Sequence, residues 1–429
     1  MALFQRKKRV VVDEVVEQRP PLPDPPAPNA DGLRSMDDHR HYLLSLVEPL
    51  PPFGMALLDA VGLALCEDIT SPLALPRHPI SHMAGYAVVA DDIAEASADE
   101  PASLTVVNGE VSPGQAGIVH EQGRVPDGAD TVVPLASTDR GEQTVRVFAP
   151  VEAGSHLRST GSDVTVDAPL ATAGQLLNDR SVGLLAGVGI DKVLARPRPR
   201  VVVVSQGADL VEPGRDLRDD DDLHDATGVL VAAAAKQAGC QVWRVSVNSA
   251  DPAELSEAIT DQLIRADLVL TTGGALDPDN HVLRGVLADL GQCDTAEVAI
   301  RPGRSQVFAL VGDDRVPLVV LPTNPVAAHA SFHAFVWPML RKLAGAHQVE
   351  QAKVRTYPST VVRSPLGLTS IQRAVVHDEG GRHRVELIPH TPDDQLAGLA
   401  RCNALAVIDE DVEFVNAGEP IGCWLLEGP

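Results

Sequence analysis

Four short loops contain residues that could bind a ligand, and three of them have glycine or arginine residues that suit an anion. The loops are residues 205–210, 271–274, 301–304 and 321–325. Glycine lets backbone N–H groups approach an anion closely, and an arginine guanidinium can donate two parallel hydrogen bonds to a phosphate. Glycine is also ordinary in turns between strands and helices, so no single loop of the four is diagnostic. The residues of interest are Gly273, Gly274, Arg301, Gly303 and Arg304.

The elements around these loops predict how they are positioned. We expect strands over 200–205, 241–247, 268–272 and 318–321, which alternate with helices over 228–238, 252–265, 281–290 and 326–343. Apolar strands that alternate with amphipathic helices are typical of a parallel sheet covered on both faces. Ligands of such sheets bind at the carboxyl ends of the strands. Three of the four loops directly follow a predicted strand.

The remaining chain predicts three other regions. Two helical pieces split by prolines are expected between residues 36 and 69, and a helix over 179–188. Five β-rich runs between glycine and proline turns predict a small β domain within 81–149, and further short runs predict a β-barrel over 351–429. Residues 1–36 hold a basic patch and a proline-rich stretch, so we expect an extended, mobile tail there.

Composition limits the possible partners. The 429 residues include 59 acidic and 35 basic side chains, for a formal charge of -24, and only 3% are aromatic. Such a chain repels phosphate backbones and has little material for base stacking, so we expect no nucleic-acid partner. No apolar run reaches the length of about 18–20 residues that a membrane helix needs, and we expect no membrane span. Five scattered cysteines without a C-x-x-C pair favour the cytoplasm.

Two further clusters have competing explanations. Asp219–Asp222 are four consecutive acids, which are more typical of a solvated loop than of a cation site, because consecutive side chains point apart. His329 and His333 are four residues apart on a predicted helix and would share one face. With no acidic third ligand nearby in sequence, packing or exposure is a better explanation than zinc.

Three more motifs complete a pattern. Ser-His-Met-Ala-Gly-Tyr-Ala over 81–87, Pro-Asp-Gly-Ala-Asp-Thr-Val-Val over 126–133 and Gly-Ser-His-Leu-Arg over 154–158 precede the four loops. Together and in this order they resemble the molybdopterin molybdenumtransferase family, called MoeA in bacteria and the E domain of gephyrin in animals. The resemblance covers about residues 37–429.

The resemblance implies a fold and a domain plan. The fold class is α/β plus β, with a molybdopterin-binding-type α/β domain, an inserted β domain and a C-terminal β-barrel, in an elongated homodimer. The expected parts are a tail over 1–36, a discontinuous N-terminal subdomain over 37–80 and 150–195, an inserted subdomain over 81–149, an α/β domain over 196–345 and a barrel over 346–429.

Several family positions differ in this chain. The family has Met-Asp-Gly-Tyr-Ala, Gly-Glu-Asp and Thr-Gly-Asp-Glu-Leu where this chain has Ala84, Ser162 and Ala208. Family enzymes insert molybdate into adenylated molybdopterin with Mg²⁺, and loss of oriented carboxylates should remove metal or transition-state stabilisation. The resemblance places Asn324 among the cofactor-binding residues and leaves Asp279 as a candidate metal ligand.

Two functions from different classes remain. The first is a gephyrin-like, non-catalytic scaffold with an eroded site, which grips a partner peptide near Pro322 and Pro325; in some actinobacterial members that partner is the C-terminal tail of the cell-division protein FtsZ. The second is an active molybdenumtransferase that uses Mg²⁺, molybdate and molybdopterin. Because the carboxylates are mostly lost, we expect the pterin-phosphate pocket to outlast the metal chemistry and to bind molybdopterin-like or adenylate ligands weakly, without molybdenum transfer.

Overall fold

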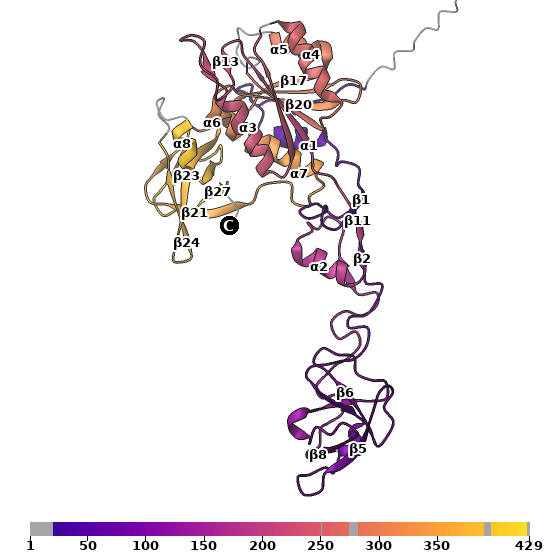
Figure 1. Cartoon of the computed structure of the whole chain (residues 1–429). Helices are drawn as coiled ribbons and strands as arrows, with labels where there is room; N and C mark the ends of the chain where they lie inside the picture. Colours follow the sequence, from indigo (N-terminus) through magenta and orange to yellow (C-terminus); the bar gives the residue numbers. More distant parts are fainter. Residues whose placement is uncertain (1–19, 250, 274–281, 390–395, 427–429) are drawn as a thin grey trace, which may run out of the picture. The chain divides into compact units, whose positions relative to one another are not determined.

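The computed structural model of the chain describes residues 20–249, 251–273, 282–389 and 396–426 (Figure 1). Its contacts form two compact units, one made of residues 1–49, 198–344 and 348–429, the other of residues 50–197 and 345–347. Each unit has hydrophobic cores of its own. This division is coarser than the expected subdomains, whose boundaries stay a prediction.

A six-stranded sheet forms the centre of the first unit. Its order is β15 (Gln241–Val247), β12 (Arg200–Gln206), β16 (Leu268–Thr272), β20 (Val316–Leu321), β19 (Ser305–Val311) and β17 (Gly291–Glu297). The first four strands run parallel, as the alternating pattern predicts, while β19 and β17 join antiparallel. The near-continuous valine and leucine runs suit strands that are buried on both faces.

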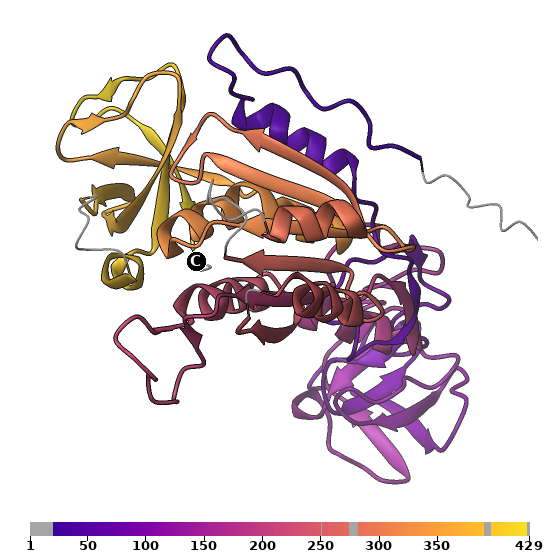
Figure 2. The same ribbon diagram turned by 90° about the horizontal axis from the view of Figure 1, so that it is seen from above.

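Helices cover both faces of this sheet (Figure 2). Helices α4 (Pro252–Leu263) and α5 (Val282–Leu290) pack against alternate side chains of β12, β16 and β20 in one core. Helices α3 (Ala226–Gln237) and α6 (Pro325–Ser331) contact each other, and α3 also contacts β12 while α6 contacts β20. The helices predicted near 228–238, 252–265 and 281–290 are therefore confirmed within the described residues, and the carboxyl ends of four parallel strands lie at one edge.

The helix expected over 326–343 is interrupted. A π-turn, η3 (Phe332–Val336), separates α6 from α7 (Trp337–Leu343). Pro338 has no backbone N–H, so the carbonyl of Ala334, four residues earlier, loses its helical donor. Arg40 of α1 (Met36–Ser45) supplies one instead, with its Nε 3.0 Å from that carbonyl oxygen. A side chain from another helix thus satisfies the polar group that the proline leaves.

The C-terminal region of this unit is a closed barrel of five strands. The order around it is β23 (Thr369–Glu379), β24 (Arg382–Leu387), β21 (Lys353–Pro358), β27 (Ile421–Leu425) and β25 (Ala404–Ile408), which pairs back with β23. The short strand β18 (Ile300–Arg301) joins β23, and a two-stranded sheet of β22 (Val362–Arg363) and β26 (Phe414–Val415) lies apart from the ring. Helix α8 (Leu396–Arg401) completes the region. The expected barrel is confirmed.

Residues 20–35 do not match the expectation of a free tail. The Pro20 carbonyl accepts hydrogen bonds from Gln292 and Arg315, at 3.0 and 2.8 Å, and Tyr42 donates to the carbonyl of Pro23. Arg34 pairs with Asp294 of β17 at 2.6 Å, and both side chains are about nine-tenths buried. A proline-rich segment needs few partners of its own because it has few N–H donors, so carbonyls and one ion pair suffice to dock it. Residues 1–19 lie outside the described chain.

The second unit contains the inserted β domain and a smaller core. Strands β7 (Thr131–Pro134), β4 (Gly85–Val88), β6 (Gln115–Val119), β5 (Ala102–Val107) and β8 (Thr144–Val147) form one sheet in that order, at the five predicted runs. Short 3₁₀ turns, η1 (Ala90–Ile93) and η2 (Leu135–Ser137), follow β4 and β7. The short strands β3 (Ile80–Ser81) and β9 (Leu157–Arg158) pair with each other.

The prediction of a second helix near residue 55 is wrong. Residues 53–56 form strand β1 (Phe53–Ala56), which pairs with β11 (Lys192–Ala195), and turns follow it. Pro51 and Pro52 precede the segment and Gly54 lies inside it, so helix propensity is low, and Met55 packs on the core with helix α2 (Asp179–Gly187). Strands β2 (Ile69–Thr70) and β10 (Pro169–Ala171) pair beside it. Tertiary pairing overrides the apolar spacing here.

Candidate functional site

A cavity of about 920 Å³ opens at the carboxyl ends of the parallel strands. We call it the strand-end cavity. It brings together three of the four loops selected from the sequence, those that follow β12, β16 and β20. Its lining residues are Gln206, Gly207, Ala208, Asp209, Leu210, Leu223, His224, Asp225, Ala226, Thr227, Ser249, Thr272, Gly273, Leu321, Pro322, Thr323, Asn324, Pro325 and Leu396.

Buried polar atoms lie at the strand ends beside this cavity. Ser205 and Gln206 end β12, and Thr271 lies next to the end of β16. Each is at least nine-tenths buried, and Ser205 Oγ, Gln206 Oε1 and Thr271 Oγ1 have no hydrogen-bond partner among the described residues. A buried polar atom without a partner is unfavourable by about 1–3 kcal/mol. A ligand or ordered water at the strand ends would remove that penalty.

The backbone of Gly273 lies close to the end of the neighbouring strand, β12. Its φ of 113° is rarely adopted by residues with side chains, and a Cβ there would lie 2.2 Å from the backbone oxygen of Gln206. The end of β16 therefore approaches the end of β12 more closely than any other residue type permits. Gly273 thus fixes the shape of one cavity wall.

Asn324 and Pro325 form the opposite wall through the start of α6. The Asn324 side chain accepts from the backbone N–H groups of Val326 and Ala327, both at 3.0 Å, which is an N-cap arrangement. Pro325 occupies the first helical turn, where a missing N–H has no consequence. Thr227 of α3 donates to the carbonyl of Thr323 at 2.8 Å and so links α3 to the loop before α6.

The loop between β12 and α3 is held by ion pairs rather than by apolar packing. The short strands β13 (Leu210–Val211) and β14 (Leu223–His224) pair within it. Arg218 contacts Asp222 at 2.6 Å and donates to the carbonyl of Ala208 at 2.8 Å. Hydrogen bonds from Arg218 lower the pKa of Asp222 to about 2. Of the four consecutive acids, Asp222 is thus a buried structural carboxylate, while the other three are exposed.

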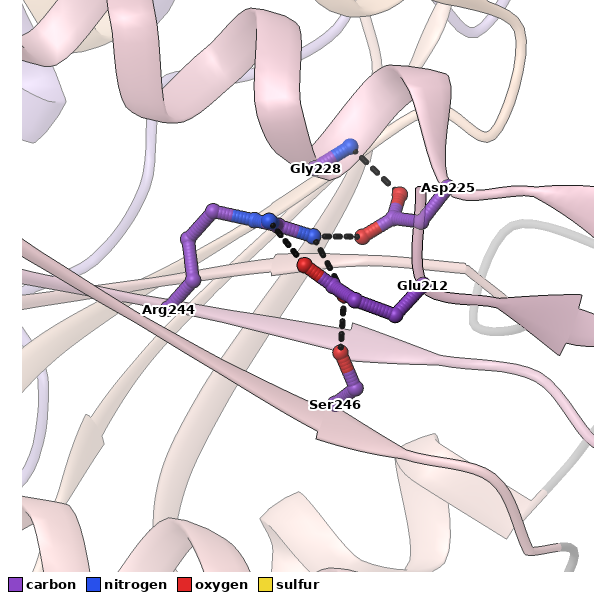
Figure 3. Close-up of polar contacts among 5 residues, drawn as sticks. All are labelled: Glu212, Asp225, Gly228, Arg244 and Ser246. Carbon is purple, nitrogen blue, oxygen red and sulfur yellow. Dashed lines mark hydrogen bonds and ion pairs between the residues drawn. The ribbon is translucent and has the colours of Figure 1, made fainter. Parts of the chain in front are cut away.

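Arg244 of β15 links this loop to the sheet (Figure 3). Its guanidinium contacts Glu212 at 2.7 and 3.1 Å and Asp225 at 2.7 Å, and Ser246 donates to Glu212 at 3.3 Å. Asp225 is 3% exposed and also caps α3 by accepting from Gly228 N at 2.7 Å. Burial acts to lower the pKa of Arg244, but its hydrogen bonds to the two carboxylates outweigh burial and leave that pKa raised.

A second cavity of about 210 Å³ lies between β18, the start of α6 and the barrel. We call it the arginine cavity. Three of its lining residues are Arg301, Arg363 and Arg373, and none of the described residues that line it is acidic. Arg373 is 3% exposed and donates to the carbonyl of Pro389 at 3.3 Å. The remaining lining residues are Pro302, Val326, Pro365, Ser370, Ile371, Gln372 and Ile388.

Helix α6 borders both cavities and carries the half-buried His329, whose ring contacts that of the buried His333 in the following turn. The rings of His329 and His333 lie 4.6 Å apart between centroids, and His333 Nδ1 is 3.0 Å from Gln351 Oε1. Burial lowers the pKa of His329 to about 3 and that of His333 to about 4. Both rings are therefore neutral at physiological pH. No cluster of three potential metal ligands occurs in the part of the chain that the structure describes.

The predicted anion-binding residues separate into different places. Gly273 and Asn324 line the strand-end cavity, while Arg301 lines the arginine cavity. Arg304 lines neither cavity and pairs with Glu297 at 3.1 Å, and Gly303 accepts from Gln306 through its carbonyl. Gly274 and Asp279 lie outside the described residues. The binding roles of all six residues and of Asp279 stay predictions.

The family positions that lack carboxylates are exposed in this chain. Ala84 and Ser162 belong to the second unit, on the loop before β4 and on the loop after β9. Ala208 belongs to the first unit and lines the strand-end cavity, as do Pro322 and Pro325.

Sequence reasoning missed three residues of these sites, Arg244, Arg363 and Arg373. Arg244 is a charged residue within the predicted strand 241–247, a signal that the sequence contained. Arg363 and Arg373 had no such signal, because only the closure of the barrel brings them beside Arg301.

Helices in the described ranges include none that is long and apolar enough to cross a membrane. Three stretches of the chain match known domains. Residues 34–189 match the MoeA N-terminal region (domain I and II), residues 202–342 a probable molybdopterin binding domain and residues 359–426 the MoeA C-terminal region (domain IV).

Whole-length relatives show the same relationship. Molybdopterin molybdenumtransferase 1 of Mycobacterium tuberculosis is 30% identical over 423 residues, which cover 92% of this chain and 99% of that protein. The molybdopterin molybdenumtransferase of a Nostoc species is 28% identical over 432 residues, with 95% and 97% covered. A crystal structure of the MoeA protein of Pyrococcus horikoshii superposes with a TM-score of 0.79 at 22% identity, over 92% of this chain and all of that one, and shares the fold. The chain therefore belongs to the MoeA family of molybdopterin molybdenumtransferases.

Proposed function

We propose that this protein takes part in molybdenum insertion, as a transferase that brings a phosphate-bearing molybdopterin and molybdate together. The observation that carries the proposal is the pairing of two unlike cavities along one helix. Pro325 lines the strand-end cavity and the next residue, Val326, lines the arginine cavity. The relatives' names support the same activity.

The strand-end cavity suits the larger ligand. Its volume lies within the range of about 300–1,000 Å³ typical of small-molecule sites. Gln206 lines this cavity, and its buried, unpartnered Oε1 would accept a hydrogen bond from a heterocycle or from a water that bridges to it. Backbone near Gly273 gives a phosphate a close approach without side-chain interference. These residues bind and orient the ligand, and no proton transfer is assigned to them.

The arginine cavity suits a small oxyanion such as molybdate. The chain as a whole is acidic, at -24, so an anion is repelled by most of the surface. The charged residues among the described lining of this cavity are Arg301, Arg363 and Arg373, which makes it a local exception. Guanidinium groups remain charged at any physiological pH and match oxyanion geometry with paired N–H donors. Ser370 and Gln372 add uncharged polar contacts to the same lining.

The described residues do not make a magnesium site by themselves. Asp225 lines the strand-end cavity, but its two oxygens already contact Arg244 and Gly228. Asp209 is the other acid in the lining, and two separated carboxylates of which one is occupied are a poor fit for a hard cation.

A direct assay tests this proposal. The full-length protein is mixed with adenylated molybdopterin and molybdate, with and without Mg²⁺, and the product is analysed for inserted molybdenum. Turnover that falls sharply in the Arg301→Ala variant supports the proposal. Binding of neither ligand by the wild type would contradict it.

A second candidate function is favoured by a separate observation. Val361, Leu366 and Phe414 lie on or beside the β22–β26 sheet, and each is more than half exposed. Exposed apolar side chains beside Arg363 fit a peptide that carries both apolar and acidic residues. On this alternative the protein is a gephyrin-like, homodimeric scaffold in the cytoplasm with an eroded site at Ala84, Ser162 and Ala208, and its partner is a peptide such as the FtsZ C-terminal tail.

The second candidate has its own test. Binding of an FtsZ C-terminal tail peptide is measured for the wild type, for Phe414→Ser and, as a matched control elsewhere on the surface, for the exposed Ile264→Ser. Loss of binding only in Phe414→Ser supports the scaffold. Light scattering at micromolar concentration reports whether the protein is a dimer, and a monomer would contradict the scaffold as stated.

A further inference from the structure

Arg244 contacts two acids beside the strand-end cavity without lining that cavity itself. Asp225 is a cavity residue and is 3% exposed, while Glu212 lies next to the paired strands β13 and β14. The two carboxylates converge on one guanidinium from the same loop (Figure 3). An anionic ligand in the cavity therefore meets a trio of one positive and two negative charges.

Close packing around Asp225 strengthens the electrostatic effect of this trio of charges. Gly228 lies in the first turn of α3, three residues after the N-cap Asp225. A Cβ on Gly228 would lie 2.1 Å from Ser205 Oγ and 2.3 Å from Asp225 Oδ2. The helix start, the acid and the end of β12 are thus in close contact, with little room for water to screen the carboxylate. Charges in such a place interact more strongly than exposed ones. Asp209 adds a further acid to the cavity lining, and no described residue of that lining is an arginine or lysine.

We propose that Arg244 is a positioning and charge-balancing residue that lets the strand-end cavity accept a phosphate-bearing ligand. It does so by offsetting one of the two negative charges that Glu212 and Asp225 place beside the cavity. The inference rests on the proposed function, since it concerns the same cavity. Arg244 has no contact with the ligand in this role, so it differs from the residues assigned to binding.

The alternative is that Arg244 is a purely structural ion pair. Arg200 offers a control on the same sheet, because it pairs with a single acid, Asp267, at 2.8 Å, at the first residue of β12 rather than at the cavity end of that strand. Arg200→Met removes a similar interaction from the same sheet. If Arg244 is purely structural, Arg200→Met and Arg244→Met should change the affinity for an anion in the cavity to the same extent. If Arg244 balances charge, only Arg244→Met should weaken that binding.

The test uses adenosine diphosphate and uncharged adenosine as probes of the full-length protein, with affinities measured by calorimetry. Arg244→Met should weaken adenosine diphosphate binding about tenfold, within the ~5–150-fold range typical of coupled sites, and leave adenosine binding unchanged. Glu212→Gln with Arg244→Met restores the formal charge of the trio to that of the wild type, so affinity for adenosine diphosphate should recover. Glu212→Gln alone removes one negative charge, keeps Arg244 on Asp225 and should tighten adenosine diphosphate binding.

Each outcome separates the hypotheses. Equal weakening of both probes, or a double variant no better than Arg244→Met, would overturn charge balance. If Arg244→Met does not fold, as judged by circular dichroism, the Glu212→Gln variant still decides, because unchanged adenosine diphosphate binding there overturns the inference. A wild type that binds neither probe contradicts the proposed use of this cavity, and the inference fails with it. A wild type that binds both, with variants that do not differ, leaves the proposed function and removes only the role of Arg244.

Discussion

The strand-end cavity and the arginine cavity border the same helix but are built in opposite ways. The first is made mainly of loops that follow strands of one sheet, and the described Asp, Glu, Lys and Arg residues of its largely apolar lining are both acids, Asp209 and Asp225. The second is made of residues 301–302, 326, 363, 365, 370–373 and 388, which only the docking of barrel and sheet brings together, and the charged residues of its described lining are all arginines. Local sequence therefore encodes the larger cavity, and long-range packing encodes the charge of the smaller one.

The largest expected effect concerns the shape of the strand-end cavity alone. Gly273→Ala would force a Cβ to within 2.2 Å of the Gln206 backbone oxygen at a φ of 113°. The change should lower the free energy of unfolding by about 3 kcal/mol, because strain and a backbone clash add. Urea unfolding measures this loss. Gly189→Ala is the control, since Gly189 also has a positive φ but its Cβ would meet no atom within 4 Å; equal losses in the two variants would contradict the close contact.

The second prediction concerns the charge of the arginine cavity. Arg301→Ala removes one guanidinium from its lining and should weaken molybdate binding by about 2 kcal/mol, roughly 30-fold, as for hydrogen bonds to charged groups. Arg304→Ala is a matched control three residues away, because Arg304 pairs with Glu297 and does not line the cavity. Calorimetry with molybdate measures both. Similar losses would show that the two arginines act on one site, contrary to the separation seen here.

A third prediction tests the helix that the cavities share. Burial lowers the pKa of His329 to about 3 and of His333 to about 4, against about 6.5 in an unfolded chain. Below pH 6.5 the unfolded state therefore binds more protons, so stability is full above that pH and is lost as pH falls towards 4. Each histidine should lower the free energy of unfolding by about 2 kcal/mol at pH 5.

Chemical denaturation between pH 7 and pH 4.5 measures this slope. The slope should decrease in His329→Phe and stay as in the wild type in His41→Phe, where the residue is exposed. Because α6 borders both cavities, acid should weaken ligand binding in both together. Acid sensitivity of one cavity alone would show that the helix does not couple them.

The comparison also explains what the sequence reveals in advance. The strands and helices of the sheet follow from apolar periodicity, and Gly273, Asn324 and Pro325 follow from turn and cap chemistry at strand ends. Arg363 and Arg373 do not, because their approach to Arg301 depends on the barrel closing through β23 and β25 and on β18 joining β23. The prediction of a helix near Met55 is wrong for a related reason. This segment forms strand β1, and its pairing partner β11 is more than 130 residues away in the sequence.

The smallest expected effect separates architecture from charge at one residue. Asn324→Ala removes the cap of α6 and should lower the free energy of unfolding by about 1 kcal/mol. Asn324→Asp keeps an oxygen acceptor for the N–H groups of Val326 and Ala327, so stability should stay near that of the wild type. The same change places a negative charge in the lining of the strand-end cavity, where it should weaken adenosine diphosphate binding and leave adenosine binding intact. Molybdate binding at the arginine cavity should respond less, because the three guanidinium groups there compensate a single added charge. If Asn324→Asp weakened molybdate binding more than adenosine diphosphate binding, the two cavities would form one electrostatic site, and the contrast between them would not hold.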